Sequence, residues 1–539
     1  MRKRNIDLGD SGERSNIPIL NAAHRKNRKR SNSDLTLPLL LLAVLIVVGV
    51  VKHSSRTSSH QVLGSDNINS VSMTPVKNVL PLQPERDLRH YEPFTFVSGS
   101  SEYDTAYNIA KQEIDDNTVN GKFIAGSGWD TLWTRDTSYA VELGAGILRP
   151  DAALQSLKQC QENDQGNVVW IQDSCMNIGR WPNLSDSIVG AQAAWHLYLL
   201  NGDKEFLGWA FSMTKNTLFR AERDVWNSKA GLFQGCSSFM ESNSGYPAKY
   251  KNKGSLVGRT KALSTNMLYY SGYKLGAAMA QELGHDEEEV LSLEKKASEL
   301  KNAIRSRMWL PKEGYYSYVE DENNELFTQM EGLGESLVLM APDFENDQSR
   351  IDSMFEKTTM LDYGIPSLWP QFQLSSAPEF WEYYHNGRYW PFVQGYWGIA
   401  AARHKKESVF EKALSGLLRL SQKHDTFAEF YELDGTMLPD RKRQLWSDAG
   451  FIGMVLYGLF GMEFTLQGVQ FHPVKPSTLP IGDTISLHQI KYRDMVLDLY
   501  ISGSGTILES FLLDQEPADA FISNAIAGYH RVDMVLKES

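Results

Sequence analysis

The chain has 539 residues, of which 11% are aromatic and 13 are Trp, and its formal net charge is −12. A chain of this length is expected to fold as one large domain with an accessory domain. The acidic balance provides no broad basic surface, which excludes nucleic acid as an expected partner. The three cysteines, Cys160, Cys175 and Cys236, form neither a disulfide framework nor a zinc-binding pattern. We therefore expect no metal and no cofactor.

The N-terminal part of the chain predicts a membrane anchor. Residues 1–34 are polar and basic, and the apolar segment Leu35–Val51 that follows contains no charged residue. Its length is at the lower end of the roughly 17–25 residues that a transmembrane helix needs. The Lys and Arg cluster at 25–30 precedes this segment and favours a cytoplasmic N-terminus. We expect a single-pass membrane protein with a stalk at 52–90 and a catalytic part that is periplasmic, lumenal or extracellular.

A cleaved signal peptide is the alternative to an anchor. The apolar core of a signal peptide is usually shorter, and residues 52–56 (KHSSR) provide no small-x-small cleavage site. The sequence therefore favours an uncleaved signal anchor.

Between residues 91 and 462 the apolar residues recur with the period of an α-helix. Two short turns, Asn201–Asp203 and Gly284–Asp286, join consecutive helices. Long loops rich in Gly and aromatic residues separate other helices, at 126–137, 168–187, 231–259 and 366–391. This alternation is typical of a ring of helical hairpins whose long loops gather on one face, where ligands bind. The predicted helices are Ser138–Leu148, Asp186–Leu200, Lys204–Arg220, Lys261–Leu283, Glu287–Met308, Gln348–Lys357, Val393–His404, Val409–Gln422 and Ser447–Gly461.

After residue 462 the pattern changes to alternating, β-branched runs that are broken by Pro, Gly and Asp. The predicted strands are Val469–Pro473, Thr484–Ile490, Asp494–Ile501 and Gly505–Leu513. Residues 463–539 therefore predict a small antiparallel β domain that packs on the helical one. The pattern of Glu516–Ser539 predicts no definite element.

Two loop motifs place charged residues beside aromatic ones, just ahead of predicted helices. The first contains Trp133, Arg135 and Asp136, and the second ends in Asp186. In a ring of hairpins both aspartates lie at the same mouth, where carboxylates bind sugar hydroxyls. The alternative role of either aspartate is to cap the helix that follows.

Glu241 lies in a third loop motif, between Phe239 and Pro247. An apolar environment raises the pKa of a carboxyl group, as a general acid that works near neutral pH requires. The alternative is an exposed loop glutamate. Glu331 and Glu335 are rival acids, but their position before a predicted helical run favours a capping or bracing role.

The fourth motif, Tyr384–Pro391, brings His385, Asn386 and Trp390 together at the entrance to a helix. These side chains offer hydrogen-bond donors and flat ring surfaces to a sugar. The alternative is that they brace the mouth of the loop.

Glu429 lies among aromatic residues in the segment 427–432 (FAEFYE), and an apolar segment then begins with Trp446. Burying a carboxylate among aromatic rings costs free energy, so a carboxylate in this position suggests a functional role. It suits a base that activates water beside a sugar ring, with Trp446 as a packing surface. A half-exposed glutamate at a helix end is the alternative, and Glu432 is the rival base.

Glu241 and Glu429 lie on separate loops, as two groups that act on opposite faces of one bond must. Inverting glycosidases need one carboxylic acid to protonate the leaving oxygen and one carboxylate to activate water. In inverting glycosidases these two carboxyl groups are ~6.5–9.5 Å apart, which leaves room for that water.

These motifs resemble those of known glycosidases. Leu132–Thr137 (LWTRDT) is similar to the WTRDS segment of glucoamylases and to the GRDT segment of glycogen-debranching amylo-α-1,6-glucosidases. Tyr384–Pro391 (YHNGRYWP) and Phe239–Pro247 resemble two further segments of the debranching group. Ala428–Tyr431, with Trp446, is similar to the base-bearing segments of glucoamylases, processing glucosidases and trehalases.

The resemblance spans roughly residues 126–461 and implies the six-hairpin glycosidase fold, an (α/α)6 barrel, with inverting hydrolysis of a glycosidic bond. It implies Glu241 as the acid and Glu429 as the base. It also implies that Arg135, Asp136 and Asp186 hold the hydroxyls of the sugar in the cleaved subsite. The chain departs from these families in having Glu rather than Asp at the acid position, and it lacks the double-Glu acid motif of glucoamylases.

We therefore expect a membrane-anchored inverting glycoside hydrolase that is exo-acting on an α-linked glucoside or a related oligosaccharide or glycan. Trp133, His385, Asn386, Trp390 and Trp446 are the further substrate-binding candidates. A phosphorylase on the same fold is one alternative, in which bound phosphate replaces the base; an acidic residue at position 429 argues against it. A non-catalytic glycan-binding membrane protein is the other alternative, and the presence of two candidate carboxylates argues against it.

Overall fold

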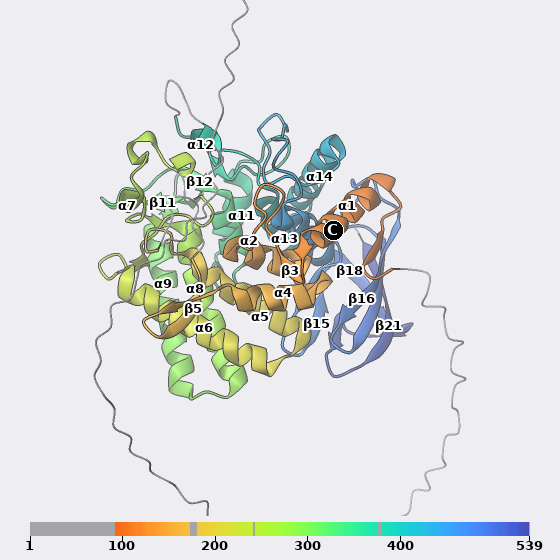
Figure 1. The fold of residues 1–539 in the computed structure, drawn as a ribbon. Coiled ribbons are helices and arrows are strands. Elements are labelled where there is room, and N and C mark those ends of the chain that lie inside the picture. The colour runs from red at the N-terminus through yellow and green to blue at the C-terminus, as the bar shows by residue number, and fades with distance from the viewer. Residues whose placement is uncertain (1–91, 173–180, 241–242, 374–379, 538–539) are drawn as a thin grey trace, which may run out of the picture. The chain divides into compact units, whose positions relative to one another are not determined.

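A computed structural model describes residues 92–172, 181–240, 243–373 and 380–537. The predicted tail, membrane helix (35–51) and stalk lie outside the described residues, as do Cys175 and the predicted acid Glu241. The described residues form a mainly helical body followed by a β region (Figure 1). This confirms the predicted division into a helical part and a C-terminal β part. Across the described ranges no helix is both long enough and apolar enough to span a bilayer.

Six inner helices follow one another around a closed ring, because each contacts the next and the last contacts the first. They are α2 (Thr134–Ala140, continued by η2, Val141–Ala145, and α3, Gly146–Leu148), α5 (Gly190–Asn201), α8 (Leu263–Leu283), α10 (Gly332–Met340), α13 (Pro391–Arg403) and α15 (Leu445–Gly453, continued by η6, Met454–Leu459). Inner helices are buried on almost every face, as α13 illustrates: all of its residues except Arg403 are buried. A helix that is apolar all round belongs in such an interior.

A second set of helices packs outside the ring. They are α1 (Ser101–Asp116), α4 (Pro150–Gln159), α6 (Lys204–Asp224), α9 (Glu287–Arg307), α11 (Gln348–Lys357) and α14 (Glu407–His424). The helix α6 packs on α5 and α8, α9 packs on α8, and α14 packs on α13. These helices bury one stripe only; in α9 the buried residues are Ala297, Leu300 and Ile304. Their spacing of three and four residues is that of an amphipathic helix.

The predicted short turns join inner and outer helices. The first ends α5 at Gly202, whose φ of 72° favours glycine, and Asp203 then caps α6 by accepting hydrogen bonds from the backbone N–H groups of Glu205 and Phe206. The second ends α8 at Gly284, with a φ of 76°. The hairpin arrangement predicted from these two turns is confirmed.

Two outer helices were not among the predicted ones. In α1 the buried stripe consists of Tyr103, Ala106, Tyr107 and Ala110. Tyr and Ala are less hydrophobic than Leu or Ile, so the difference in hydrophobicity between the buried and the polar face is small. The short helix α4 buries mainly Ala152, Ala153 and Leu157. The predicted start of α8 at residue 261 is wrong by two residues, because β8 (Lys261–Ala262) pairs with β11 (Val319–Glu320) first.

The C-terminal region forms two sheets. The larger sheet has the strand order β1-β16-β17-β21-β18-β19 and the smaller one β14-β15-β20. Their bounds are β1 Thr95–Val97, β14 Met462–Phe464, β15 Gly468–Phe471, β16 Thr484–Tyr492, β17 Met495–Gly503, β18 Ile507–Leu513, β19 Glu516–Pro517, β20 Phe521–Ser523 and β21 Gly528–Lys537. In Figure 1 the blue strands β16, β18 and β21 form this sheet beside the orange helix α1. Strand β1, from the start of the described chain, pairs with β16.

The prediction of a purely antiparallel β domain is wrong at one pair, because β21 runs parallel to β17. Strand β21 inserts between β17 and β18 and is antiparallel to β18. Parallel neighbours need a long connection, and residues 504–527 provide it. The alternating pattern of β21 falls within Glu516–Ser539, for which the sequence predicted no element.

Candidate active site

A small hollow lies where the N-terminal ends of several inner helices meet. It is lined by Trp129, Trp133, Arg135, Asp136, Phe239, Tyr384, His385, Trp390, Glu429 and Trp446. Seven of these are residues that the sequence predicted for the site, and they come from three separate motifs. Trp129, Phe239 and Tyr384 lie within the predicted motifs but were not predicted as site residues. Asp186 and Asn386 do not line this hollow.

Glu429 is the carboxylate at the centre of this aromatic group, and it is only 2% exposed. Its loop between α14 and α15 is fixed by its own backbone N–H, which donates to the carbonyl of Arg441 at 2.9 Å. The side-chain Oε1 accepts hydrogen bonds from the indole of Trp129, at 2.8 Å, and from the hydroxyl of Tyr384. The other oxygen, Oε2, lies 3.5 Å from Nη1 of Arg441 and accepts no hydrogen bond from the described residues.

Burial raises the pKa of Glu429, and Arg441, Tyr384 and Trp129 offset this effect only in part. The group therefore titrates closer to neutral pH than an ordinary glutamate does. A carboxylate with a raised pKa is a stronger base once it is ionised, and Oε2 is the oxygen that remains for a ligand or water.

Glu113, which lies beside the buried Asp448, braces the loop that carries Glu429. Glu113, on α1, accepts hydrogen bonds from the Thr426 hydroxyl at 2.5 Å and from the Phe427 backbone N–H at 3.1 Å. Beside it, Asp448 in the first turn of α15 is completely buried. Burial and the nearby charge of Glu113 raise the pKa of Asp448 well above its usual range. The raised pKa favours the protonated form of Asp448, which reduces the repulsion between Asp448 and Glu113.

Arg135, Asp136 and Asp186 form a second polar group. Asp136 accepts a hydrogen bond from Gln444 at 2.7 Å, and Nη1 of Arg135 lies 3.8 Å from Oδ2 of Asp186. Asp186 also accepts from Gln172 at 3.0 Å and from the Ser238 hydroxyl at 2.8 Å. Asp186 therefore contacts the hollow through Arg135 rather than directly.

The rings around the hollow pack on one another. Trp446 stacks on Phe392 at 4.1 Å between ring centroids, and His385 stacks on Trp390 at 5.0 Å. Nδ1 of His385 lies 2.8 Å from the Ser244 hydroxyl. Burial, with the charges of Arg135 and Arg388, lowers the pKa of His385 well below its usual range. The ring is thus neutral at physiological pH and offers one donor and one acceptor.

Asn386 follows His385 in the chain but contacts a different part of the loop. Its side chain accepts from the backbone N–H of Phe372 at 2.8 Å and donates to the carbonyl of the same residue at 2.9 Å. These two bonds brace the 366–391 loop, which was the alternative role for this motif.

The segment before position 241 is fixed at the edge of the hollow. Phe239 lines the hollow and packs edge-on against Trp390 at 5.1 Å. Its φ of 58° is rare for an aromatic residue, and the Met240 backbone N–H donates to the Ser238 carbonyl at 2.9 Å across this tight turn. Such strain persists only where the surrounding structure holds it.

Glu331 supplies part of that restraint. Its carboxylate accepts a hydrogen bond from the Ser237 hydroxyl and one from the Ser264 backbone N–H at 3.0 Å. The Ser264 hydroxyl in turn accepts from the Ser238 backbone N–H at 3.0 Å. Burial raises the pKa of Glu331 to about 7, although Ser237 and Ser264 lower it in part. Glu331 thus braces the turn at Phe239.

The other two rival carboxylates have structural partners. Glu335 accepts from the Tyr316 backbone N–H at 3.0 Å. Glu432 binds Arg388, whose Nε donates to Oε2 at 2.9 Å. Neither residue lines the hollow around Glu429.

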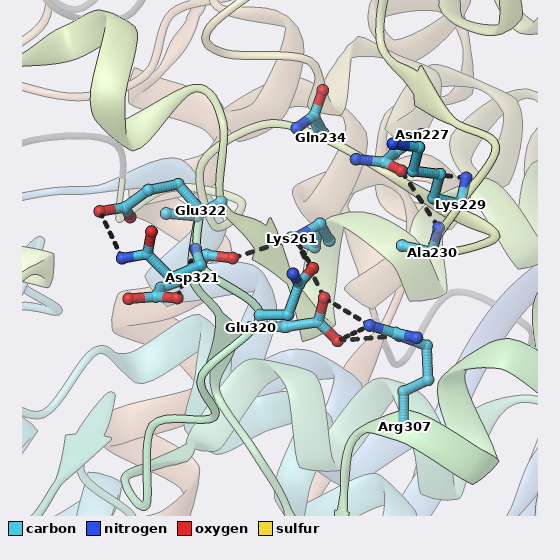
Figure 2. Close-up of polar contacts among 12 residues, drawn as sticks. Asn227, Lys229, Ala230, Gln234, Lys261, Arg307, Glu320, Asp321 and Glu322 are labelled. Carbon is cyan, nitrogen blue, oxygen red and sulfur yellow. Dashed lines mark hydrogen bonds and ion pairs between the residues drawn. The ribbon is translucent and has the colours of Figure 1, made fainter.

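A buried ion cluster lies at β8, directly before α8, and Figure 2 shows its residues Lys261, Glu320 and Arg307. Lys261 and Glu320 are almost fully buried and lie 3.0 Å apart, and Arg307 donates two hydrogen bonds of 2.8 Å to Glu320. Burial opposes ionisation of Glu320, but the bonds from Arg307 and Lys261 lower its pKa below the usual value. Lys261 also donates to the Asp321 carbonyl at 3.0 Å.

Several residues of the site had weak or no signals in the sequence. Trp129 and Tyr384 could have been chosen from the motifs that contain them, because a buried carboxylate needs donors. Gln444 opens the apolar segment that contains Trp446. Arg441 lies in a polar turn without a motif, and only the fold brings it to Glu429.

Comparison with known proteins agrees with this fold. The family model of the mannosylglycerate hydrolase MGH1-like glycoside hydrolase domain matches residues 149–447. A sialidase structure is similar with a TM-score of 0.59 and 15% identity, over 77% of this chain and 39% of that one. A GH78 family rhamnosidase of a Bacillus species has a TM-score of 0.54 and 11% identity, over 83% of this chain and 44% of that one. The GH63 mannosylglycerate hydrolase of Thermus thermophilus in complex with glucose has a TM-score of 0.52 and 15% identity, over 65% of this chain and 100% of that one.

Identities this low establish the fold alone, and the chain spans less than half of the sialidase and of the rhamnosidase. Among proteins with curated descriptions, none matches the chain. The fold and the aromatic hollow define a protein of the six-hairpin glycosidase superfamily, which confirms the resemblance seen in the motifs. Within it, the chain belongs to the MGH1-like glycoside hydrolase family, whose model matches more than half of its length.

Glu331→Gln tests the bracing role and its pH dependence. Because the folded-state pKa of Glu331 is about 7 and the unfolded value is near 4.5, the folded protein binds the extra proton between these pH values. Protonated Glu331 therefore stabilises the folded protein below pH ~4.5. This contribution to the free energy of unfolding, about 3 kcal/mol in all, is lost as the pH rises to ~7. Glu331→Gln should remove this slope in the free energy of unfolding measured against pH.

Glu320→Gln provides a control of opposite sign. The pKa of Glu320 is lowered in the folded state, so its contribution is present above the unfolded pKa and is lost as the pH falls. This variant should be destabilised most at neutral pH. An unchanged slope in Glu331→Gln would show that Glu331 is ionised in the folded protein throughout this range.

Proposed function

We propose that this chain is an inverting, exo-acting glycoside hydrolase built on an (α/α)6 barrel, with Glu429 as the general base. The observation that carries the proposal is the environment of Glu429: a carboxylate buried among aromatic rings, with Oε1 held by two donors and Oε2 without a hydrogen bond from the described residues. Fixing one oxygen orients the other, which is what a base that activates a water molecule needs.

The hollow beside Glu429 is small. Its volume is about 30 Å³, which suits one or two water molecules rather than a sugar ring. Binding of a sugar beside Glu429 therefore requires side chains around the hollow to move. The phosphorylase alternative needs phosphate at this position, and a buried carboxylate repels phosphate.

We propose Glu241 as the general acid. The turn that precedes it is held at the edge of the hollow through Phe239, and Ser244, which follows it, lies 2.8 Å from His385 on the same edge. A pair of carboxyl groups on opposite sides of the glycosidic bond gives inversion of the anomeric carbon.

We propose that Arg135 and Asp136 hold the hydroxyls of the sugar in the cleaved subsite, that Asp186 positions Arg135, and that Trp133, His385, Trp390 and Trp446 surround the sugar ring. The substrate we expect is an α-linked glucoside or a related oligosaccharide. The structurally similar Thermus thermophilus mannosylglycerate hydrolase has been crystallised with glucose and with D-glycerate, so α-mannosylglycerate belongs in the substrate panel.

The second candidate is a glycan-binding protein without turnover. The same aromatic lining and the Arg135–Asp186 pair would bind a sugar in either case. The environment of Glu429 favours the hydrolase, because a binding protein has no need of a buried base.

Glu429→Gln should lower hydrolysis by about a hundredfold or more, because a general base contributes roughly 10²–10⁴ to the rate. The assay measures sugar release from α-gluco-, α-manno- and α-rhamno-configured substrates and from α-mannosylglycerate, with the product anomer followed by NMR. Glu432→Gln is the matched control: it changes a carboxylate on the same loop that binds Arg388 outside the hollow, and it should retain activity.

Full activity in Glu429→Gln would reject this residue as the base. Turnover that depends on added phosphate would favour the phosphorylase. Sugar binding by calorimetry without hydrolysis of any substrate in the panel would favour the binding protein.

Tyr384→Phe should move the acidic limb of the kcat/KM profile to higher pH. The Tyr384 hydroxyl donates to Glu429 and stabilises its charged form, so its loss raises the pKa of the base further. A base works only when it is ionised. On acidification the Tyr384→Phe variant should therefore lose activity at a higher pH than the unaltered protein does. Tyr389→Phe removes a hydroxyl of the neighbouring loop that makes no bond to Glu429 and should leave the limb in place. A shift toward lower pH in Tyr384→Phe would contradict this assignment.

We also propose that Leu35–Val51 anchors the chain in a membrane with the N-terminus in the cytoplasm. The catalytic domain is then 91–462 and the β domain 463–539, on the far side of the membrane. The full chain should stay with membranes after alkaline extraction, whereas a chain without residues 35–51 should not. A mature N-terminus located after residue 51 would instead establish a cleaved signal peptide.

A further inference from the structure

A second and much larger cavity lies further along the same inner helices. Trp446 lines the hollow at the start of α15, whereas Tyr457, in the η6 turn that continues this helix, lines the second cavity. Likewise Trp390 precedes α13 at the hollow, and Arg403 at the end of α13 lines the cavity. The cavity has a volume of about 330 Å³, within the roughly 300–1,000 Å³ of small-molecule sites. Among the described residues, none lines both spaces.

Two π-helical turns border this cavity. The turn η2 places Glu142 and Leu143 in its wall, and η6 places Tyr457 there. In η2 the chain passes through Gly144 with a φ of 139°, and a Cβ at this position would lie 2.8 Å from Ile452. A π-helical turn is a rare and less favourable conformation that is found frequently at functional sites. Two π-helical turns at one cavity favour a functional role for the cavity.

Polar side chains line the inner wall. The Tyr396 hydroxyl donates to Glu142 at 2.5 Å, and Nε2 of His196 lies 3.2 Å from the Tyr457 hydroxyl. Oε1 of Gln192 is buried and accepts no hydrogen bond from the described residues. A buried acceptor of this kind costs free energy unless a ligand or water donates to it.

Burial changes the pKa of two groups in the inner wall. Burial, together with the charge of Arg403, lowers the pKa of His196 to about 4, so its ring is neutral at pH 7. Burial also raises the pKa of Glu142, although the bond from Tyr396 offsets part of this effect. The polar groups of this wall are therefore hydroxyl, imidazole and amide groups beside the Glu142 carboxyl, and most of the other lining residues are apolar.

The cations at this cavity do not favour an anionic ligand. Lys274 donates to both carboxylate oxygens of Glu294, at 2.9 and 2.7 Å. Arg403 is exposed, and the acidic residues Glu142 and Glu463 lie on the same lining. The half-buried ring of Trp195 adds an aromatic surface. Aromatic surface beside neutral donors and acceptors is the lining that a polyhydroxylated molecule requires.

We propose that this cavity is a binding site for a neutral polyhydroxylated small molecule, either a monosaccharide or a small polyol, and that it is separate from the hollow around Glu429. The inference does not depend on hydrolysis, because no group of the cavity takes part in the proposed reaction. A ligand in the cavity would contact α13 and the continuations of α2 and α15 together. The same helices begin at the hollow.

The test is calorimetric titration of D-glucose, D-mannose and glycerol into the full chain and three variants. Gln192→Leu removes the buried acceptor, and Ala278→Trp, on the cavity wall, fills the space without removing a polar group. Trp133→Ala is the matched control at the hollow. At least one probe should bind; its affinity should fall about tenfold or more in Gln192→Leu, be lost in Ala278→Trp and stay within about twofold in Trp133→Ala.

Two results would overturn the proposal: no binding of any of the three probes to the unaltered chain, or loss of binding in Trp133→Ala with both cavity variants unaffected. Thermal unfolding of each variant shows whether it is folded. If Gln192→Leu and Ala278→Trp both fail to fold, a crystal of the unaltered chain soaked with the bound probe decides the question. Density in the cavity supports the site, and density in the hollow alone rejects it.

Discussion

The burial of carboxylates inside the ring of inner helices is the constraint on which the rest of the structure depends. The inner helices are apolar on almost every face, so an acidic side chain among them has lost its water. Glu429, Glu331 and Asp448 are all placed this way, and burial raises the pKa of each. Such groups are tolerated only where donors, or a proton, compensate for the lost hydration.

The same constraint fixes the loops at the hollow from distant parts of the chain. Glu113 on α1 holds Thr426 and Phe427, and Glu331 at the start of α10 holds Ser237. Because these anchors come from different hairpins, closing the ring also sets the geometry of the hollow. The site and the fold are therefore stabilised by one set of contacts.

The sequence predicted the helical ring and most of the hollow because the signals were local. Trp133, Arg135 and Asp136 share one motif, and Glu429 lies in an aromatic segment whose composition is visible without the fold. Arg441 and the parallel strand β21 were not predictable in the same way, because each depends on contacts between segments distant in the chain. Asn386 shows the limit of a motif: it is next to His385 in sequence but braces a loop instead of lining the hollow.

The two ends of the inner helices have different electrostatic character. The N-terminal end of a helix carries a partial positive charge that favours anions, and the C-terminal end favours cations. Asp136 and Asp448 lie in the first turns of α2 and α15, and Arg403 lies in the last turn of α13. Asp136 and Asp448 are thus placed where the helix dipoles favour a negative charge. Glu142, further along, lacks this assistance; the hydroxyl of Tyr396 and the charge of Arg403 stabilise its ionised form instead.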